Sequence, residues 1–360
     1  MAMIRVELSR EQCREQAREI VTLDGLRASL FRFPTGVEAL RLANARGHVL
    51  ILPWMGQMVW DAVFDGVPLA MDSLFPAPRP AQGIIDTYGC FAFHSGLLRN
   101  GCPGPEDDHP LHGEFPCAAM DRAWLEAGED ARGAFLRLAG EREHAVGFGS
   151  RYLASPSVEI RADSTLFDIG LTARNLAGRP MELMYMCHVN FAFVPGGRFV
   201  QPAPFTPEAT VVRTAIPAHV PATEPYRAFL RTLAEDPGRM RTLDETERYD
   251  PEQVFYLHGL RSDADGCTHL MLRRPEGDGF AMSYAPAAFP HTVRWVLCGP
   301  DEKVAAFALP STCEPEGYAA EKRKGNVRSL APQQVADFRV TCGYLDAATA
   351  DRMETRIASL

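Results

Sequence analysis

Long apolar runs and basic clusters are both missing from this sequence. Its 360 residues contain 37 Lys and Arg against 46 Asp and Glu, so the formal net charge is −9. A nucleic-acid-binding surface needs clustered Lys and Arg to neutralise phosphates, and the densest basic run, 322–324, is short. No stretch approaches the roughly 18 to 20 apolar residues that cross a bilayer. We therefore expect neither a nucleic-acid partner nor a membrane partner.

A secretion signal and a disulfide framework are also missing. The first 20 residues carry a charge every few positions and have no apolar core, so we expect no signal peptide. Nine cysteines are scattered without regular spacing, and an odd number of this kind favours free thiols in a reducing compartment. The sequence therefore predicts a cytoplasmic protein.

Motifs for nucleotides and zinc are absent as well. There is no Gly-x-Gly-x-x-Gly after a strand, no phosphate-binding loop, no Cys-x-x-Cys and no nucleophile elbow. Nucleotide-driven chemistry and a zinc ribbon therefore have little support.

Short alternating segments separated by turn residues dominate what is present. In 181–193, the apolar side chains of every second residue share one face, and His188 and Asn190 lie on the other. The neighbouring run 166–174 alternates too, and turn residues in 175–178 predict an antiparallel hairpin between the two runs. The pattern predicts one large β-sandwich, with further strands at 28–33, 37–42, 48–53, 57–64, 145–153, 157–162, 210–215, 253–260, 268–273, 280–284, 292–298, 303–309 and 336–343.

Helical patterns are few. Ser9 and Gln12 form a capping-box pattern, which predicts a surface helix over 10–20. Further helices are expected near 225–235 and in the tail. The predicted organisation is a helical N-terminal extension packed on the domain, a single β-domain, and a C-terminal helix or tail, at 1–25, 26–345 and 346–360.

The loop His109-Pro-Leu-His112-Gly-Glu114 is the first candidate for chemistry. Gly113 permits a ligand to approach the backbone closely, and prolines fix the loop. A histidine that simply bonds to backbone explains the segment equally well. His109, His112 and Glu114 are also metal-ligand types, although the His-x-His spacing of a cupin-type site is missing.

Two further candidates follow strands. His188 and Asn190 share one strand face, and two polar groups there need a partner or a cavity, although a satisfied core histidine is the simpler reading. Histidine is a natural proton donor or acceptor at neutral pH. Glu314 and Glu316 follow the apolar run 303–309, where a carboxylate can act as a base or belong to a solvated acidic loop. Residues 321–324 are expected to be solvated.

Four motifs in order carry a family resemblance. They are ILPWMGQMVWDAVFDGVPL (51–69), GCFAFHSGLLRNGCP (89–103) with PLHGEFP (110–116), TARNLAGRPMELMYMCHVNF (172–191) and LPSTCEPEGYAAEKRKGNVRSL (309–330). The set, spread over most of the chain, resembles the galactose-mutarotase-like superfamily, specifically the aldose 1-epimerase-related proteins of a poorly characterised bacterial branch. The resemblance implies an all-β fold, a large antiparallel β-supersandwich with a few peripheral helices.

The resemblance also implies an activity and its residues. Aldose 1-epimerases are isomerases that exchange the α and β anomers of a free sugar by acid-base ring opening and closure, without a cofactor or a metal. His188 corresponds to the acid, and His112 to the histidine that binds the ring or C1 oxygen. The base is expected from the C-terminal carboxylates, with Glu314 preferred and Glu316 second. The usual relatives place this glutamate at the strand end before a proline, where this chain has Leu309.

Three more residues are predicted to bind the sugar. Asn190 shares the strand face of His188, Arg99 precedes the Leu-His-Gly motif, and Trp60 could stack on the apolar face of a sugar. Because Arg binds carboxylates bidentately, Arg99 extends the expected substrates to acidic sugars. The expected partner is thus a monosaccharide, bound by a monomer or homodimer. The alternatives are a non-catalytic carbohydrate-binding protein and a metal-dependent sugar isomerase that uses His109, His112 and Glu114.

Overall fold

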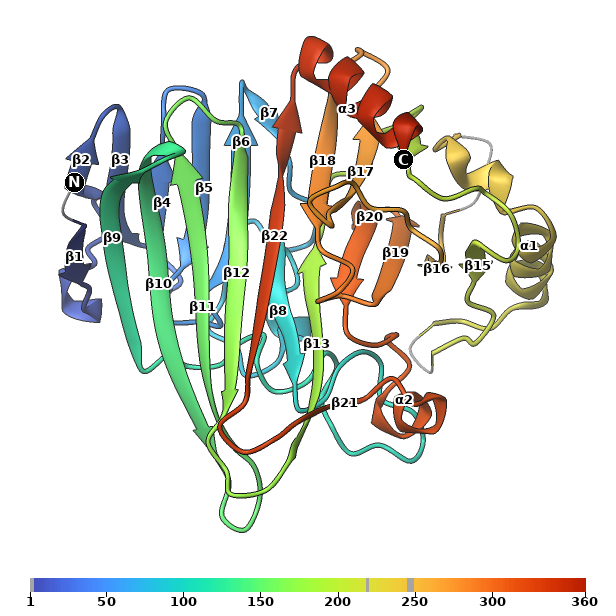
Figure 1. The fold of residues 1–360 in the computed structure, drawn as a ribbon, viewed down its shortest axis with the longest axis horizontal. Coiled ribbons are helices and arrows are strands. Elements are labelled where there is room, and N and C mark those ends of the chain that lie inside the picture. Colours follow the sequence, from blue (N-terminus) through green and yellow to red (C-terminus); the bar gives the residue numbers. More distant parts are fainter. Residues whose placement is uncertain (1–2, 218–219, 245–248) are drawn as a thin grey trace.

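The computed structural model describes residues 3–217, 220–244 and 249–360. Two large antiparallel sheets form its layers (Figure 1). The first has nine strands in the order β1 (Ile4–Glu7), β9 (Arg122–Asp130), β10 (Gly133–Ala145), β11 (Arg151–Arg161), β12 (Leu166–Asn175), β22 (Val335–Leu345), β18 (Gly279–Tyr284), β17 (Thr268–Arg273) and β14 (Arg198–Val200).

The second sheet has thirteen strands. Its order is β15 (Thr210–Val212), β16 (Gln253–Leu257), β19 (His291–Cys298), β20 (Lys303–Ser311), β13 (Met181–Val189), β8 (Ala92–Leu97), β6 (Met58–Phe64), β5 (Gly47–Leu52), β4 (Glu38–Ala43), β3 (Leu26–Arg32) and β2 (Arg18–Leu23), with β21 (Arg328–Leu330) on β13 and β7 (Val67–Pro68) on β6.

Helices lie at the periphery of the two sheets (Figure 1). The α-helices are α1 (Glu224–Glu235), α2 (Tyr318–Lys324) and α3 (Ala347–Ser359), and the 3-10 turns are η1 (Arg10–Gln12), η2 (Ile84–Thr87) and η3 (Pro237–Arg241). The helices expected near 225–235 and in the tail are therefore confirmed, as is the all-β supersandwich. No helix in the described part of the chain combines the length and apolarity needed to cross a membrane.

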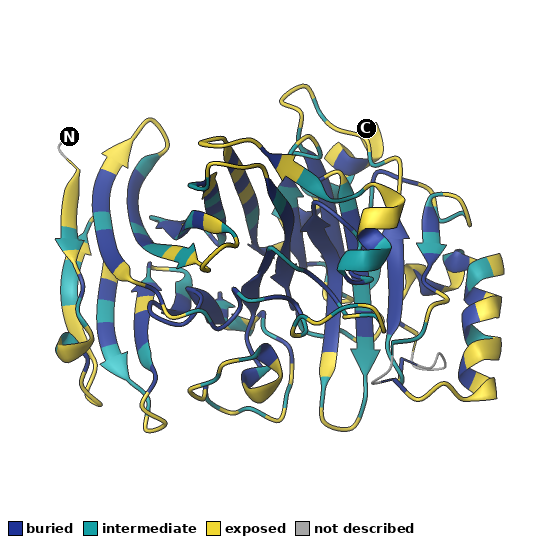
Figure 2. Ribbon diagram, turned by 90° about the horizontal axis from the view of Figure 1, so that it is seen from below, coloured by how far each residue is buried: buried dark blue, intermediate teal, exposed yellow. Residues whose placement is uncertain are grey.

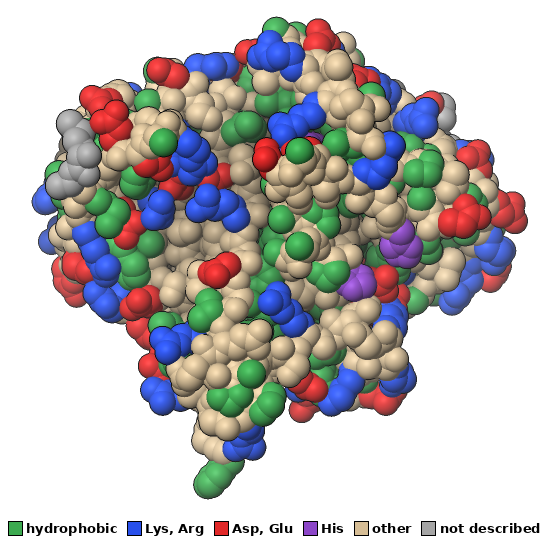
Figure 3. Space-filling view, viewed as in Figure 1, with side chains coloured by type: hydrophobic (Ala, Val, Ile, Leu, Met, Phe, Trp, Pro, Cys, Tyr) green, Lys and Arg blue, Asp and Glu red, His purple; other side chains and the backbone are tan. Residues whose placement is uncertain are grey.

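The core lies between the sheets, where the buried residues concentrate (Figure 2). On β13, Leu183, Tyr185 and Cys187 point into the main core cluster, as the alternation predicts. Successive strand residues point to opposite faces, so His188 projects from the outer face of this sheet. On the outer face of the other sheet, charges of both signs are intermixed (Figure 3), for example Arg137 beside Glu159.

The predicted helix over 10–20, and with it the helical N-terminal extension, is wrong. The expected capping contact forms, because the Ser9 backbone N–H donates to Gln12 Oε1 at 2.9 Å, but the turn ends there as η1. From Arg18 the chain is strand β2, paired with β3. The segment has no continuous apolar stripe that a helix could bury, whereas a strand gains its hydrogen bonds from β3.

The predicted hairpin of 166–174 with 181–193 is also wrong. β12 pairs with β11 and β22, whereas β13 pairs with β8, β20 and β21 in the other sheet. The turn residues thus carry the chain across the sandwich. Asn175 anchors this crossing, because its buried side-chain amide donates to the carbonyls of Arg179 and Leu330. The single strand expected at 145–153 is wrong in part: Ala145 ends β10, residues 146–150 form the turn, and Arg151 already begins β11.

Candidate active site

Two histidines predicted from distant motifs meet at the outer face of the thirteen-stranded sheet. The ring centroids of His112 and His188 lie 4.8 Å apart, and the ring planes are at 80°. His188 comes from β13, and His112 from the loop after β8. His112 has φ 62° and Gly113 φ 80°. A Cβ at Gly113 would lie 2.0 Å from the Arg99 carbonyl oxygen, so the motif needs glycine to bring the loop this close.

Asn190 fixes the orientation and tautomer of His188. The Asn190 amide Nδ2 donates to the Cys90 carbonyl at 3.0 Å, so its Oδ1 faces His188 Nδ1 at 2.8 Å. Because Oδ1 can only accept, Nδ1 of His188 carries a proton and donates it to that bond. In the neutral ring, Nε2 is then the free basic nitrogen.

His188 is neutral over the physiological range. Burial lowers its pKa to about 3, and the hydrogen bond with Asn190 only partly opposes this effect. His112 is positioned by Ser95, whose Oγ lies 3.0 Å from His112 Nδ1. Ser95 in turn bonds to Asn100, so two buried polar side chains hold the second ring in place.

Three aromatic rings enclose the histidine pair. Phe93 stacks on His188 with a centroid distance of 4.5 Å, and Trp295 contacts it edge-on at 5.7 Å. The Tyr88 hydroxyl lies 3.4 Å from His188 Nε2. Trp295 Nε1 is buried and has no hydrogen-bond partner among the described residues. A buried donor of this kind is costly unless a water or a ligand satisfies it.

The pair is nearly closed to solvent. His112 is 7% exposed and His188 is 3% exposed, whereas Tyr88 and Trp295 are half-buried above them. Tyr88 follows directly after the short turn η2, and its ring contacts both histidine rings. A ligand must therefore displace Tyr88 or Trp295 to reach Nε2 of His188.

The C-terminal carboxylates form a separate cluster after β20. Glu314, Glu316 and Glu321 all accept hydrogen bonds from Lys324 Nζ, at 2.6, 2.5 and 2.9 Å. The expectation that residues 321–324 are solvated is wrong for Glu321, which is fully buried. Three carboxylates this close resemble a cation site, but the ammonium group of Lys324 already serves as their common cation.

Glu316 links this cluster to the sheet face of the histidines. The Tyr256 hydroxyl donates to Glu316 Oε1 at 2.8 Å, and Tyr256 belongs to the same outer apolar cluster as Trp295. Burial alone would raise the pKa of Glu316, but the hydrogen bonds from Lys324 and Tyr256 outweigh it and lower the pKa. Glu316 is therefore an anion at neutral pH, held by two donors.

A buried ion pair that the sequence did not reveal lies nearby. Arg213, 7% exposed, donates to the Glu252 carboxylate. Burial, followed by the neighbouring Cys90 and Glu252, raises the pKa of Tyr88 well above its usual value. Tyr88 therefore stays protonated and can donate its hydrogen bond to His188.

Three residues predicted to contact the sugar make other contacts in the structure. Asn190 is fully buried with both ends of its amide engaged, so it holds His188 and cannot touch a ligand in this conformation. The Arg99 guanidinium stacks 3.7 Å from the centroid of the Tyr318 ring. Trp60 is 6% exposed and packs in an apolar cluster with Phe93. The aromatic rings of Trp295 and Tyr88, rather than that of Trp60, contact the His188 ring edge-on.

The metal-ligand alternative in the histidine loop is not supported. The Nδ1 atom of His109 faces the Pro110 carbonyl at 2.9 Å. Glu114 Oε1 accepts from the backbone N–H groups of Leu97 and Leu98 and from the Tyr152 hydroxyl, all at 2.9 Å. In the described ranges, the one group of metal-ligand atoms that lie together is the glutamate cluster, so His109, His112 and Glu114 do not converge.

Comparison with solved structures identifies the fold. A candidate aldose 1-epimerase from Klebsiella pneumoniae superposes with TM-score 0.81 at 16% identity, covering 99% of this chain and 96% of that one. A galactose mutarotase-like protein from Clostridium acetobutylicum gives 0.54 at 12% identity, with 92% and 98% covered. A candidate aldose 1-epimerase from Escherichia coli gives 0.51 at 12%, with 95% and 99% covered. The fold is that of the galactose-mutarotase-like proteins.

The family follows from the sequence match. Residues 34–343 match the model of a family described as a domain of unknown function, DUF4432. The match spans most of the chain, and the chain belongs to this family. No curated protein matches it.

Proposed function

We propose that this protein is an aldose 1-epimerase-like isomerase that exchanges the α and β anomers of a free sugar. The observation that carries the proposal is the meeting of His112 and His188, with ring centroids 4.8 Å apart, at a sheet face lined by aromatic side chains. Two imidazoles with an unpartnered indole N–H beside them suit a ligand that offers both ring oxygen and hydroxyl groups.

The reaction needs an acid and a base on either side of the C1–ring-oxygen bond, with one of the two groups protonated. A base removes the proton of the C1 hydroxyl while an acid protonates the ring oxygen, so that the ring opens. Rotation about C1–C2 and closure with the roles reversed yield the other anomer. The imidazolium form of His188, a minor fraction at neutral pH, donates its Nε2 proton to the ring oxygen and regains a proton when the ring closes. His112 is the group that binds the ring or C1 oxygen.

Glu316 is the better candidate for the base. It is an anion whose Tyr256 contact ties it to the sheet face on which Trp295 lies. Glu314 also bonds to Lys324, but among the described residues it is Glu316 that accepts the hydrogen bond from Tyr256. At the position where the usual relatives carry this glutamate, Leu309 is buried in the same outer cluster. The base must therefore come from the loop after β20.

The substrate reaches this site when Tyr88 or Trp295 moves. A free guanidinium at the site would favour an acidic sugar. Among the described residues, Arg213 is instead paired with Glu252 and Arg99 stacks on Tyr318. The proposal therefore covers free aldoses, with acidic sugars included in the test. The nine free cysteines suit a cytoplasmic setting, and the proposed acid-base reaction needs no cofactor.

The test is anomer exchange measured by NMR. Selective inversion of one anomeric resonance, transferred to the other, reports the exchange rate without a coupled enzyme. The panel is glucose, galactose, arabinose, xylose and glucuronate, with and without the protein. Faster exchange of at least one aldose supports the proposal. If every member of the panel exchanges only at its spontaneous rate, the activity is refuted.

A second candidate is a sugar-binding protein without catalysis. Two observations favour it: Leu309 stands where the usual relatives have their base, and Lys324 holds both replacement glutamates. Calorimetry separates the two functions. Saturable binding of a sugar that shows no enhanced exchange, and that is lost in His188→Asn, would establish this candidate in place of the isomerase.

A further inference from the structure

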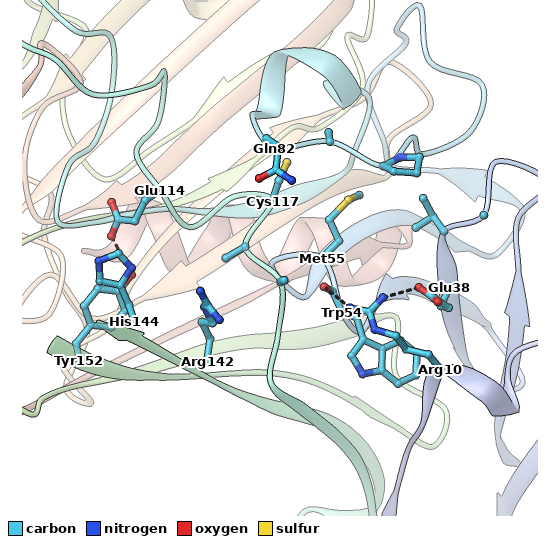
Figure 4. Close-up of a pocket in the computed structure, with 16 residues that line it drawn as sticks. Arg10, Glu38, Trp54, Met55, Gln82, Glu114, Cys117, Arg142, His144 and Tyr152 are labelled. Carbon is cyan, nitrogen blue, oxygen red and sulfur yellow. Dashed lines mark hydrogen bonds and ion pairs between the residues drawn. The ribbon is translucent and has the colours of Figure 1, made fainter. Parts of the chain in front are cut away.

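A cavity of about 580 Å³ lies between the two sheets, apart from the histidine pair. Figure 4 shows its walls: Arg142, His144 and Tyr152 come from strands β10 and β11, while Trp54 and Met55 follow β5 in the other sheet. Arg10, Glu114 and the segments 36–38, 80–82 and 117–119 complete the lining. Neither His112 nor His188 is among the lining residues, so this cavity is not the site described above.

At this cavity, the inward-facing side chains of β10 change from apolar to polar. Leu136 and Leu138 fill the core from that face, and the same alternation carries Arg142 and His144 to inward positions. The His144 ring stacks on Tyr152, with centroids 4.8 Å apart and planes 11° apart. An apolar pair at these positions would have continued the core, so the sequence keeps this end of the sandwich open and polar.

His144 presents an unsatisfied atom. Its Nε2 is buried and has no hydrogen-bond partner among the described residues, and the Tyr152 hydroxyl beneath it is already donated to Glu114. Burial lowers the pKa of His144 against the opposing charge of Glu114, so the ring is neutral at pH 7. A neutral imidazole can offer either a donor or an acceptor, as a hydroxyl group can.

The charges that line the cavity are already compensated. Arg10 pairs with Glu38 at 2.9 Å, and Arg142 with Asp121 at 3.0 Å. Glu114 Oε1 receives three hydrogen bonds. An ionic ligand would therefore meet no uncompensated counter-charge. Hydroxyl groups, which both donate and accept, match walls that present guanidinium, amide, carboxylate and imidazole groups together, beside the apolar surface of Trp54 and Met55.

We propose that this cavity is a second binding site, for a neutral hydroxylated ligand of saccharide size. Its volume lies within the range of roughly 300–1,000 Å³ that is usual for small-molecule sites. His144 Nε2 bonds to a ligand hydroxyl, and Gln82, exposed at the rim, supplies a further amide. The site functions independently of the histidine pair.

The experiment measures binding by calorimetry to the full-length His188→Asn protein, in which the histidine site is disabled. The probes are glucose and maltose as neutral ligands, gluconate as an anion and glucosamine as a cation. His144→Phe keeps the stacking on Tyr152 but removes Nε2. His48→Phe is the matched control, since His48 lies on β5 outside this cavity.

We expect a neutral probe to bind at one site per chain, with affinity at least about tenfold weaker in His144→Phe and unchanged in His48→Phe. The imidazole resonances of His144 should shift on binding. The proposal is overturned if no neutral probe binds more tightly than about 10 mM, if His144→Phe binds as well as the parent, or if a charged probe binds more tightly than both neutral ones. Because the background lacks His188, none of these results bears on anomer exchange.

Discussion

Asn190 Oδ1 accepts a hydrogen bond from His188 Nδ1 at 2.8 Å, and this contact determines which nitrogen of the imidazole is free to react. The other end of the same amide is held by the Cys90 carbonyl. Asn190 follows the last residue of β13, so it lies where the strand leaves the sheet. A residue predicted to bind the sugar thus becomes the positioning residue for the proposed proton donor.

Replacing Asn190 should therefore impair catalysis more than binding. In Asn190→Ala, the Cys90 carbonyl loses its donor and His188 is free to adopt the other tautomer. We expect kcat for anomer exchange to fall by about 10- to 100-fold with little change in KM, and stability to fall by about 1–3 kcal/mol. Exchange kinetics and urea unfolding measure the two effects.

Asn190→Asp provides the matched control. Aspartate keeps an acceptor for His188 Nδ1 but cannot donate to the Cys90 carbonyl. Activity recovered above that of the alanine variant would show that the bond to His188 matters for the reaction. If both variants retain the parent kcat, the positioning role is wrong.

The strand pattern predicted much of this architecture because the alternation of side chains between the two faces of a strand is a local property of the sequence. Alternation in 181–193 correctly placed Tyr185 in the core and His188 on the outer face. The connection that follows β12 was misread because turn residues do not reveal whether the next strand pairs with the last one or crosses to another sheet. The helix at 10–20 failed for a related reason, since its hydrogen bonds are made with β3.

Of the candidate site, only the residues that stand in recognisable motifs could be predicted from the sequence. His112 and His188 stand in recognisable segments, and the structure brings them together. Trp295, Tyr88 and Lys324 gave no local signal that they belong beside them. Lys324 stands in a charged run that reads as solvated, and only the fold shows that Glu321 beneath it is fully buried. Contacts between segments about 100 residues apart require tertiary pairing that one sequence does not reveal.

The rate of anomer exchange should increase as the pH falls. Burial lowers the pKa of His188 to about 3, and its donors lower the pKa of Glu316, so the resting pair lacks its transferable proton at neutral pH. The protonated fraction of His188 grows about tenfold for each pH unit lost. We expect kcat/KM to rise as the pH falls from 8 to 5, after the spontaneous rate is subtracted. A profile that is flat over this range would exclude His188 as the proton donor.

Lys324 should contribute to stability in a pH-dependent way. In Lys324→Met, three carboxylates lose their common cation, and the buried Glu321 is left with only its other donors. The pKa of Glu316 is lower in the folded protein than in the unfolded chain. Its favourable interactions are therefore fully present above the unfolded-state pKa of this glutamate, and they are lost as the pH falls through its folded-state pKa. We expect a lower Tm than the parent at pH 7, and a smaller difference at pH 4.

Thermal unfolding of both proteins at several pH values measures this difference. Lys322→Met, two residues earlier in α2, is the control, because Lys322 bonds to Glu182 and Tyr318 at the surface. Equal Tm losses in the two variants, or a Tm difference that stays constant between pH 7 and pH 4, would contradict the role given to Lys324.

Tyr88 should control both access to the histidines and the protonation of His188. Burial is the main reason for the low pKa of His188, and the Tyr88 ring is one of the groups that bury it. Tyr88→Ala should therefore raise the pKa of His188 by about one pH unit or more, toward the value of a solvated imidazole. Tyr88→Phe keeps the covering ring and should leave this pKa low. NMR titration of the His188 resonances distinguishes the two variants, and equal values in both would show that Tyr88 does not shield the histidine.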